Sequence, residues 1–128
     1  MLNLRKNAGK GTGKMLPRRI PKKAKRASRW KSPAHCNFVR SHACCNCDSE
    51  VNIEVAHVRI GTGAGMGQKP DDWFTVSLCS DCHALQHTKG ERSFWAANAI
   101  DPIALANEFA KASPKAREIA DAKREREQ

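Results

Sequence analysis

The feature that most constrains this chain is a repeated Cys-x-x-Cys motif. The first copy runs from Cys44 to Cys47 and the second from Cys79 to Cys82, with 31 residues between them. Each copy sets two thiolates on a tight turn, and two such turns complete the tetrahedral four-sulfur site of structural zinc. A chain with only 5% aromatic residues also gains folding free energy from such a site. The spacing therefore predicts a structural zinc ion held by Cys44, Cys47, Cys79 and Cys82.

The other two cysteines, Cys36 and Cys45, are expected to be buried thiols, although Cys45 could replace Cys44 as a ligand. Disulfide bonds are the alternative use of six cysteines in a short chain, but they need an oxidising compartment. The basic N-terminus lacks the apolar stretch of a secretory signal, and no apolar run is long enough to span a bilayer. We therefore expect a cytoplasmic protein with no membrane partner.

Positive charge is concentrated at the N-terminus. The chain has 128 residues and a net charge of +10, and its first 31 residues hold 12 Lys or Arg and no acidic residue. The remainder holds 11 basic and 13 acidic residues, a net of −2. A Gly, Pro and Lys rich stretch with few apolar residues cannot offset the entropy of ordering, so residues 1–31 are predicted to form a flexible, disordered arm.

Twelve cations on such an arm can neutralise DNA phosphates and release counterions. This predicts DNA binding with little sequence specificity and a steep salt dependence; a solvated tail is the alternative. The candidate contacts on the arm are Arg18, Arg19, Lys22, Lys23, Lys25 and Arg26.

Local patterns predict an α+β fold. Ser32 followed by Pro33 indicates an N-cap and a first helical residue, which begins a helix that ends near residue 41. Apolar and polar residues alternate from residue 51, which predicts a strand over 51–58, and a second strand is expected over 74–78. The glycine-rich residues 61–72 between them predict a loop.

Helices are expected after the second strand. Ser80 is predicted to cap a helix that ends near Lys89, before Gly90. A helical turn is expected at 94–95, and Asp101-Pro102 and Ser113-Pro114 predict two further helix starts. The predicted organisation is a basic arm at 1–31, a zinc-containing domain at 32–112 and a polar C-terminal helix at 113–128.

Three histidines indicate a second metal-binding region. His83 and His87 are four residues apart on the predicted helix, so both imidazoles project from one face and can share an ion. His57, at the end of the first strand, could reach the same place. A closed four-cysteine site beside an open histidine site is typical of a structural metal next to a catalytic one. Alternatively, His57 is a core residue and His87 caps a helix end.

The segments HACCNC, AHVRIGTGAGMGQKPDDWFTVSLCSDCHALQH and GERSFWAANAIDPIALA resemble the HNH, or ββα-metal, nucleases in their zinc-stapled form. They are most similar to phage and prophage HNH proteins related to the recombination-promoting nuclease Ref. The resemblance covers residues 30–106. It implies a small zinc-stapled ββα-metal core with flanking helices and, for a phage-encoded chain, a location in the host cytosol.

The resemblance also implies a mechanism. His57 would activate a water molecule that attacks a phosphodiester bond. His83 and His87 would hold a catalytic Mg²⁺, Mn²⁺ or other divalent cation. Asp72, which stands where many members have the asparagine of the family name, would add negative charge for that cation, or would instead order the loop. The neighbours of His57 are Ala56 and Val58 rather than a second metal ligand, so the strand supplies either the base or a ligand.

Together these features predict a metal-dependent DNA endonuclease of low sequence specificity in phage recombination or DNA processing, with a host recombination protein as a candidate partner. Arg59 and Lys69 are further candidate phosphate contacts. The alternative is a zinc-dependent nucleic-acid-binding or protein-recruiting module without catalysis. An RNA reader is disfavoured because the chain has no tyrosine and few aromatic residues for base stacking.

Overall fold

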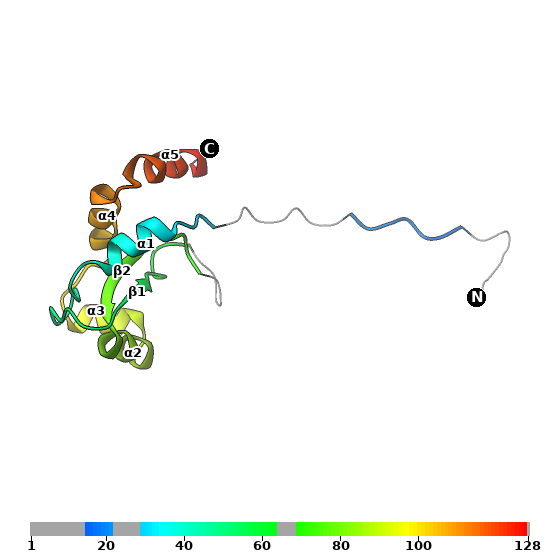
Figure 1. The fold of residues 1–128 in the computed structure, drawn as a ribbon. Helices are drawn as coiled ribbons and strands as arrows, with labels where there is room; N and C mark the ends of the chain where they lie inside the picture. Colours follow the sequence, from blue (N-terminus) through cyan, green and yellow to red (C-terminus); the bar gives the residue numbers. More distant parts are fainter. Residues whose placement is uncertain (1–14, 22–28, 64–68, 128) are drawn as a thin grey trace.

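A computed structural model describes residues 15–21, 29–63 and 69–127 and confirms the predicted α+β class. Within these residues, two strands form one antiparallel sheet, and there are five helices. In chain order the elements are α1 (Pro33–Arg40), β1 (Ile53–His57), β2 (Thr75–Cys79), α2 (Ser80–Lys89), α3 (Glu91–Ala97), α4 (Pro102–Ala112) and α5 (Ala116–Arg126). Of the helices, α5 lies beyond α4 and away from the strands (Figure 1).

The two strands pair from Ile53 opposite Cys79 to His57 opposite Thr75. All five residues of β2 are buried, whereas β1 keeps one partly exposed face. The alternation correctly indicated a strand, but the strand is shorter than predicted and its buried residue is Ala56, whereas Val51 lies outside the strand and is exposed. The register places His57 at one end of the hairpin and Cys79 at the other, so the two regions of interest lie at opposite ends of the sheet.

The capping signals place the starts of α1 and α4. The Ser32 hydroxyl accepts a hydrogen bond from the backbone N–H of His35 at 3.1 Å, and proline follows the cap. The Asp101 carboxylate accepts from the N–H of Ala104, also at 3.1 Å, and proline again follows. Such caps satisfy N–H groups that have no partner inside the helix. Both predicted helix starts are confirmed.

The predicted cap of α2 is wrong by one residue. Ser80 is the first residue of the helix, and Cys79 is its N-cap, with its sulfur accepting from the N–H of Cys82 at 3.5 Å. The Cys-x-x-Cys turn therefore itself begins the helix. This arrangement ties the cysteines to the start of the element that carries His83 and His87.

The last helix begins later than predicted. Ser113 ends α4, and α5 begins at Ala116. The Ser113 hydroxyl oxygen bonds to the Lys115 N–H and to His35 Nδ1, so it acts in the turn between the helices and is not the N-cap of α5. The polar α5 still packs on the body, because Ile119 is buried against Trp73 and Ala110.

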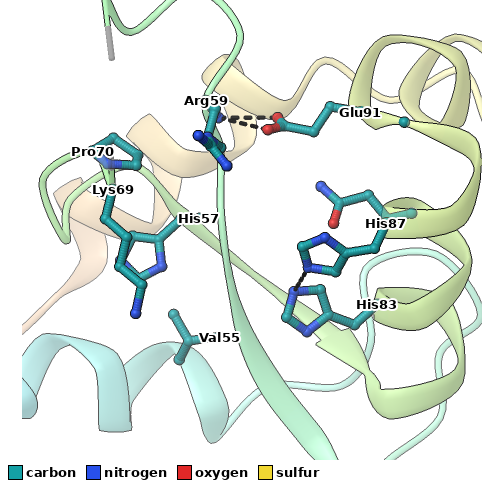
Figure 2. A pocket seen from close by; sticks show the side chains of 10 residues that line it. Val55, His57, Arg59, Lys69, Pro70, His83, His87 and Glu91 are labelled. Atoms are coloured by element: carbon teal, nitrogen blue, oxygen red, sulfur yellow. Dashed lines mark hydrogen bonds between the residues drawn. The ribbon is translucent and has the colours of Figure 1, made fainter. Parts of the chain in front are cut away.

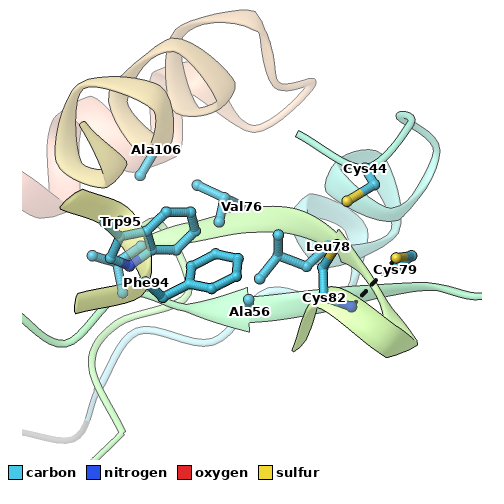
Figure 3. Packing of buried hydrophobic residues seen from close by; sticks show 10 residues of the cluster. Cys44, Ala56, Val76, Leu78, Cys79, Cys82, Phe94, Trp95 and Ala106 are labelled. Atoms are coloured by element: carbon cyan, nitrogen blue, oxygen red, sulfur yellow. Dashed lines mark hydrogen bonds between the residues drawn. The ribbon is translucent and has the colours of Figure 1, made fainter. Parts of the chain in front are cut away.

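The main core lies between the sheet and the helices that follow it. Val76 and Leu78 of β2 contact the large side chains of Phe94 and Trp95 from α3 (Figure 3). The same cluster continues to Cys44, Cys79 and Cys82. The cysteines are therefore part of the packed interior rather than an appendage to it.

The N-terminal segment is described in part. Residues 15–21, which include Arg18 and Arg19, are exposed and form no helix or strand. The other predicted contacts on the arm, Lys22, Lys23, Lys25 and Arg26, lie outside the described residues. Within the described ranges, no helix has the length and apolar character needed to cross a membrane.

Candidate functional site

Four cysteines gather at the junction of β2 and α2. The Sγ atoms of Cys44, Cys47, Cys79 and Cys82, here called the cysteine cluster, all lie within 4.8 Å of one another. All four are free thiols, and the Cys47 and Cys79 sulfurs are 3.6 Å apart. Among residues 15–21, 29–63 and 69–127, no other group of three or more His, Cys, Asp or Glu side chains gathers in this way. The predicted four ligands are therefore brought together.

The surroundings of the cysteine cluster favour a bound cation. The Cys44 sulfur accepts from the N–H groups of Asn46 and Cys47, at 3.4 and 3.5 Å. Burial opposes its ionisation, but backbone donors outweigh burial and lower the pKa of Cys44 to about 7. Burial raises the pKa of Cys82 to about 12. Four sulfurs this close cannot all be thiolates without a cation between them, so the donor set fits a structural metal such as zinc.

The two remaining cysteines lie outside the cluster. Cys36 on α1 and Cys45 are both partly exposed. Burial raises the pKa of Cys45 to about 12 and that of Cys36 to about 11, so both are neutral thiols at neutral pH. The alternative in which Cys45 replaces Cys44 does not match the geometry, because Cys44 is the member of the cluster.

The second region is an open pocket of about 440 Å³. We call it the histidine pocket; it is lined by Val55, His57, Arg59, Lys69, Pro70, His83, Gln86, His87, Gly90 and Glu91. Figure 2 shows His83 and His87 on α2 at one side of the pocket and His57, with Lys69, at the other. The strand histidine and the helix histidines therefore line one pocket, and in Figure 2 the β1 ribbon runs between them. They do not form one ligand cluster.

His57 is held by a buried carboxylate. Its Nε2 lies 2.9 Å from Asp72 Oδ1, and the side chains of the two residues are 19% and 8% exposed. Burial disfavours the Asp72 charge, but hydrogen bonds from His57, the Ser32 N–H and Arg29 outweigh it and lower the pKa of this carboxyl. A carboxylate can only accept, so Nε2 carries the proton and Nδ1 of neutral His57 has the free lone pair.

Asp72 does not join His83 and His87. Its Oδ1 accepts from Arg29 Nη1 at 2.6 Å as well as from His57, and its Oδ2 accepts from the Ser32 N–H at 2.9 Å. Of the two roles open to Asp72, these contacts match the ordering role, because both oxygens already have donors. Asp72 links the start of α1 to the strand histidine.

The helix histidines form a close pair. His83 Nε2 and His87 Nε2 are 3.2 Å apart, and His83 Nδ1 lies 2.7 Å from Glu54 Oε1 on β1. The carboxylate accepts the Nδ1 proton, which leaves Nε2 of neutral His83 unprotonated. Metal-bound imidazoles are commonly oriented by a carboxylate in this way. His87 Nε2–H can then donate to His83 Nε2, so the Glu54 carboxylate and the hydrogen bond between the two rings fix the orientation of His83.

Two of the predicted DNA contacts, Arg59 and Lys69, also line the histidine pocket. The backbone N–H of Arg59 donates to both carboxylate oxygens of Glu91, at 3.1 and 2.9 Å. This bond joins the residues after β1 to the first turn of α3. It holds the Arg59 backbone at the edge of the pocket.

Sequence reasoning missed Glu54 and Arg29. Each acts through a partner far away in the chain, since Glu54 is 29 residues from His83 and Arg29 is 43 residues from Asp72. The signal for Glu54 was its position on the predicted strand, three residues before His57. Arg29 could not be distinguished by sequence from the other Lys and Arg residues of the N-terminal segment.

Neither the comparison with curated proteins nor that with solved structures gave a match. Residues 13–112 match a family described as "Protein of unknown function (DUF968)". The match covers both Cys-x-x-Cys motifs, Asp72 and the three histidines of the pocket. It spans most of the chain, which therefore belongs to the DUF968 family.

Proposed function

We propose that this protein is a metal-dependent DNA endonuclease of low sequence specificity. The observation that carries the proposal is the His57 and Asp72 pair, which faces the same pocket as the His83 and His87 pair. The order β1, β2 and α2 is also the order expected of the ββα-metal nucleases that the sequence resembles. A base and a metal-ligand pair across one open pocket suit the hydrolysis of a phosphodiester bond.

His57 is the proposed general base. Its Nε2 donates to Asp72, so Nδ1 can take a proton from a water molecule in the pocket. The imidazolium that forms is stabilised by the Asp72 carboxylate, which stays charged because its pKa is lowered. General-base catalysis of this kind contributes about 10²- to 10⁴-fold to a rate.

His83 and His87 are the proposed ligands of a divalent cation. Two metal–imidazole bonds at a tetrahedral angle place the nitrogens about 3.3 Å apart, and the Nε2 atoms are separated by 3.2 Å. Once bound, the cation would stabilise negative charge on the phosphate. Imidazole ligands suit zinc and nickel better than Mg²⁺ or Mn²⁺, so we expect Zn²⁺ or Ni²⁺ to support the reaction best.

We propose DNA as the substrate because basic residues lie at the pocket and on the N-terminal segment. Arg59 and Lys69 line the pocket, and Arg18 and Arg19 are exposed on the N-terminal segment. Contacts to phosphate carry no base information, which accounts for the proposed low specificity. Zinc in the cysteine cluster would hold the β2 and α2 junction and take no part in the chemistry.

Nicking of supercoiled plasmid tests the function. The wild type, His57→Ala and His42→Ala are incubated with Mn²⁺, Mg²⁺, Ni²⁺ or Zn²⁺, and EDTA is the blank. His42 is an exposed histidine just after α1, and it contacts Phe38 and Phe109 and does not line the pocket. The proposal predicts nicking by the wild type and by His42→Ala, and a loss of at least about 100-fold in His57→Ala.

Equal nicking by the wild type and His57→Ala would assign the activity to another base or to a contaminant. DNA binding without nicking under every metal would favour the non-catalytic zinc module. Binding is measured on the same samples by fluorescence anisotropy with a labelled duplex, so the two functions are separated directly.

A further inference from the structure

The last turn of α5 is bonded to a residue beside the proposed active site. Arg126 Nη1 and Nη2 donate to Asp71 Oδ2 and Oδ1, at 2.9 and 3.1 Å. Two parallel bonds of this kind fix the guanidinium and the carboxylate in one plane. The Arg126 guanidinium also lies 5.4 Å from the ring centroid of Trp73. The Asp71 side chain is only 10% exposed, whereas the Arg126 side chain is 45% exposed, so the carboxylate is the shielded partner of this pair.

Asp71 also holds the start of the folded body. Its Oδ1 accepts from the Trp30 backbone N–H at 2.6 Å, and the Asp72 N–H donates to the Trp30 carbonyl at 3.0 Å. Asp71 and Asp72, here called the aspartate pair, therefore hold both the backbone N–H and the backbone carbonyl of Trp30. Trp30 lies in the stretch that connects the basic N-terminal residues to α1.

The second member of the aspartate pair reaches His57. Asp72 accepts from Arg29, from the Ser32 N–H and from His57 Nε2. Three parts of the molecule thus meet at two adjacent aspartates: the end of α5, the root of the basic segment and the strand histidine. A change in the position of Asp71 moves Asp72 directly, because the two residues share a peptide bond.

We propose that Arg126 is a positioning residue for His57 and that it acts through the aspartate pair. The inference rests on the proposed nuclease function and deepens it, because it assigns a role to α5. Arg126 lies beyond residues 13–112, so the residue is outside the part of the chain that matches the family. A displacement of about 1 Å in a catalytic constellation can cost on the order of 100-fold in rate, and the bidentate bond restrains that displacement.

The test compares two arginines in the same helical turn. Arg124 forms a salt bridge with Asp121 on the exposed face of α5, so Arg124→Ala is the matched control for Arg126→Ala. We expect Arg126→Ala to lower kcat for plasmid nicking about tenfold with KM changed less than twofold. Arg124→Ala should leave kcat within twofold, and Arg126→Lys should recover part of the loss.

Two further readouts separate positioning from fraying of α5. Amide hydrogen exchange at Trp30 should accelerate in Arg126→Ala but not in Arg124→Ala, because only the former loosens the acceptor Asp71. In a double-mutant cycle, Asp71→Asn and Arg126→Ala should lower kcat by less together than the product of their separate effects.

The inference is overturned if Arg126→Ala and Arg124→Ala have the same kcat and the same Trp30 exchange rate, or if the cycle is additive. A wild type that does not nick DNA would overturn the proposed function instead, and the exchange rate of Trp30 would still report whether the Arg126 bond holds the aspartate pair.

Discussion

The cysteine cluster and the histidine pocket adjoin one helix, yet the two regions are built in different ways. Cys79 and Cys82 lie at the start of α2, and His83 begins the pocket at the very next residue. The four sulfurs fill one small volume within 4.8 Å of one another, whereas the histidines face an open pocket of about 440 Å³. The first arrangement leaves no room for a substrate, and the second does.

Under the proposed function, the difference shows how one short helix would serve two purposes. A closed set of four ligands supplies folding free energy, and an open pair leaves coordination positions for water and phosphate. The backbone N–H groups that stabilise the Cys44 sulfur belong to its own turn, although the cluster brings together two turns that are 31 residues apart in the sequence. The pocket instead depends on carboxylates from other segments, namely Glu54, Asp72 and Glu91.

Removing one sulfur of the cysteine cluster should have the largest effect on stability. Cys47 is exposed, so replacing its thiol by a hydroxyl would ordinarily change stability little. We expect Cys47→Ser to lose the structural metal and to lower Tm by more than about 10 °C. Metal content by mass spectrometry and melting followed by circular dichroism measure both effects. Cys36→Ser is the control, and a Cys47→Ser protein with the Tm of that control would show that the cluster does not stabilise the fold.

Removing the Glu54 carboxylate, which bonds to His83, should lower the metal affinity of the histidine pair and leave the cysteine cluster unchanged. Glu54→Ala frees His83 to rotate and to change tautomer, so we expect the affinity of the histidine pair for a transition metal to fall about 10- to 100-fold. Calorimetric titration of Mn²⁺ or Ni²⁺ into protein with a filled cysteine cluster measures this affinity. The exposed Glu50→Ala is the matched control. Equal affinities in the two variants would mean that Glu54 does not orient a ligand.

Acid should lower the stability of the fold by a smaller amount. His35 is buried with Nδ1 bonded to Ser113, and burial lowers its pKa below 6.5, with Asp72 opposing this shift and Lys123 adding to it. The unfolded chain then binds the proton more tightly, so stability present above pH 6.5 is lost as the pH falls below it.

We expect the Tm of the wild type to be about 5 °C lower at pH 5.5 than at pH 8. His35→Gln removes this titration and should flatten the dependence. A variant with the same pH dependence as the wild type would assign the effect to other groups.

The sequence predicted the parts of the fold that local chemistry determines. The Ser32-Pro33 and Asp101-Pro102 signals located two helices, and the Cys-x-x-Cys spacing identified all four members of the cluster. The cap of α2 was wrong because a cysteine sulfur took the place of the expected serine oxygen.

The partners within the pocket could not be predicted, because they are distant in sequence. Asp72 meets His57 across 15 residues and Arg29 across 43, and Arg126 meets Asp71 across 55. Such pairs depend on how the hairpin, α1 and α5 pack, which no local pattern encodes. The relation to HNH nucleases and the division into an arm, a domain and a C-terminal helix remain predictions.

The central claim is that the cluster and the pocket hold different metal ions for different purposes. The most direct test is a Co²⁺ titration of reduced, metal-free protein followed by absorption, since thiolate ligands give charge-transfer bands and imidazoles do not. We predict one tight ion with thiolate bands and a second, weaker ion without them; His83→Ala should abolish only the second. A single binding event, or a loss of the thiolate bands in His83→Ala, would contradict the account.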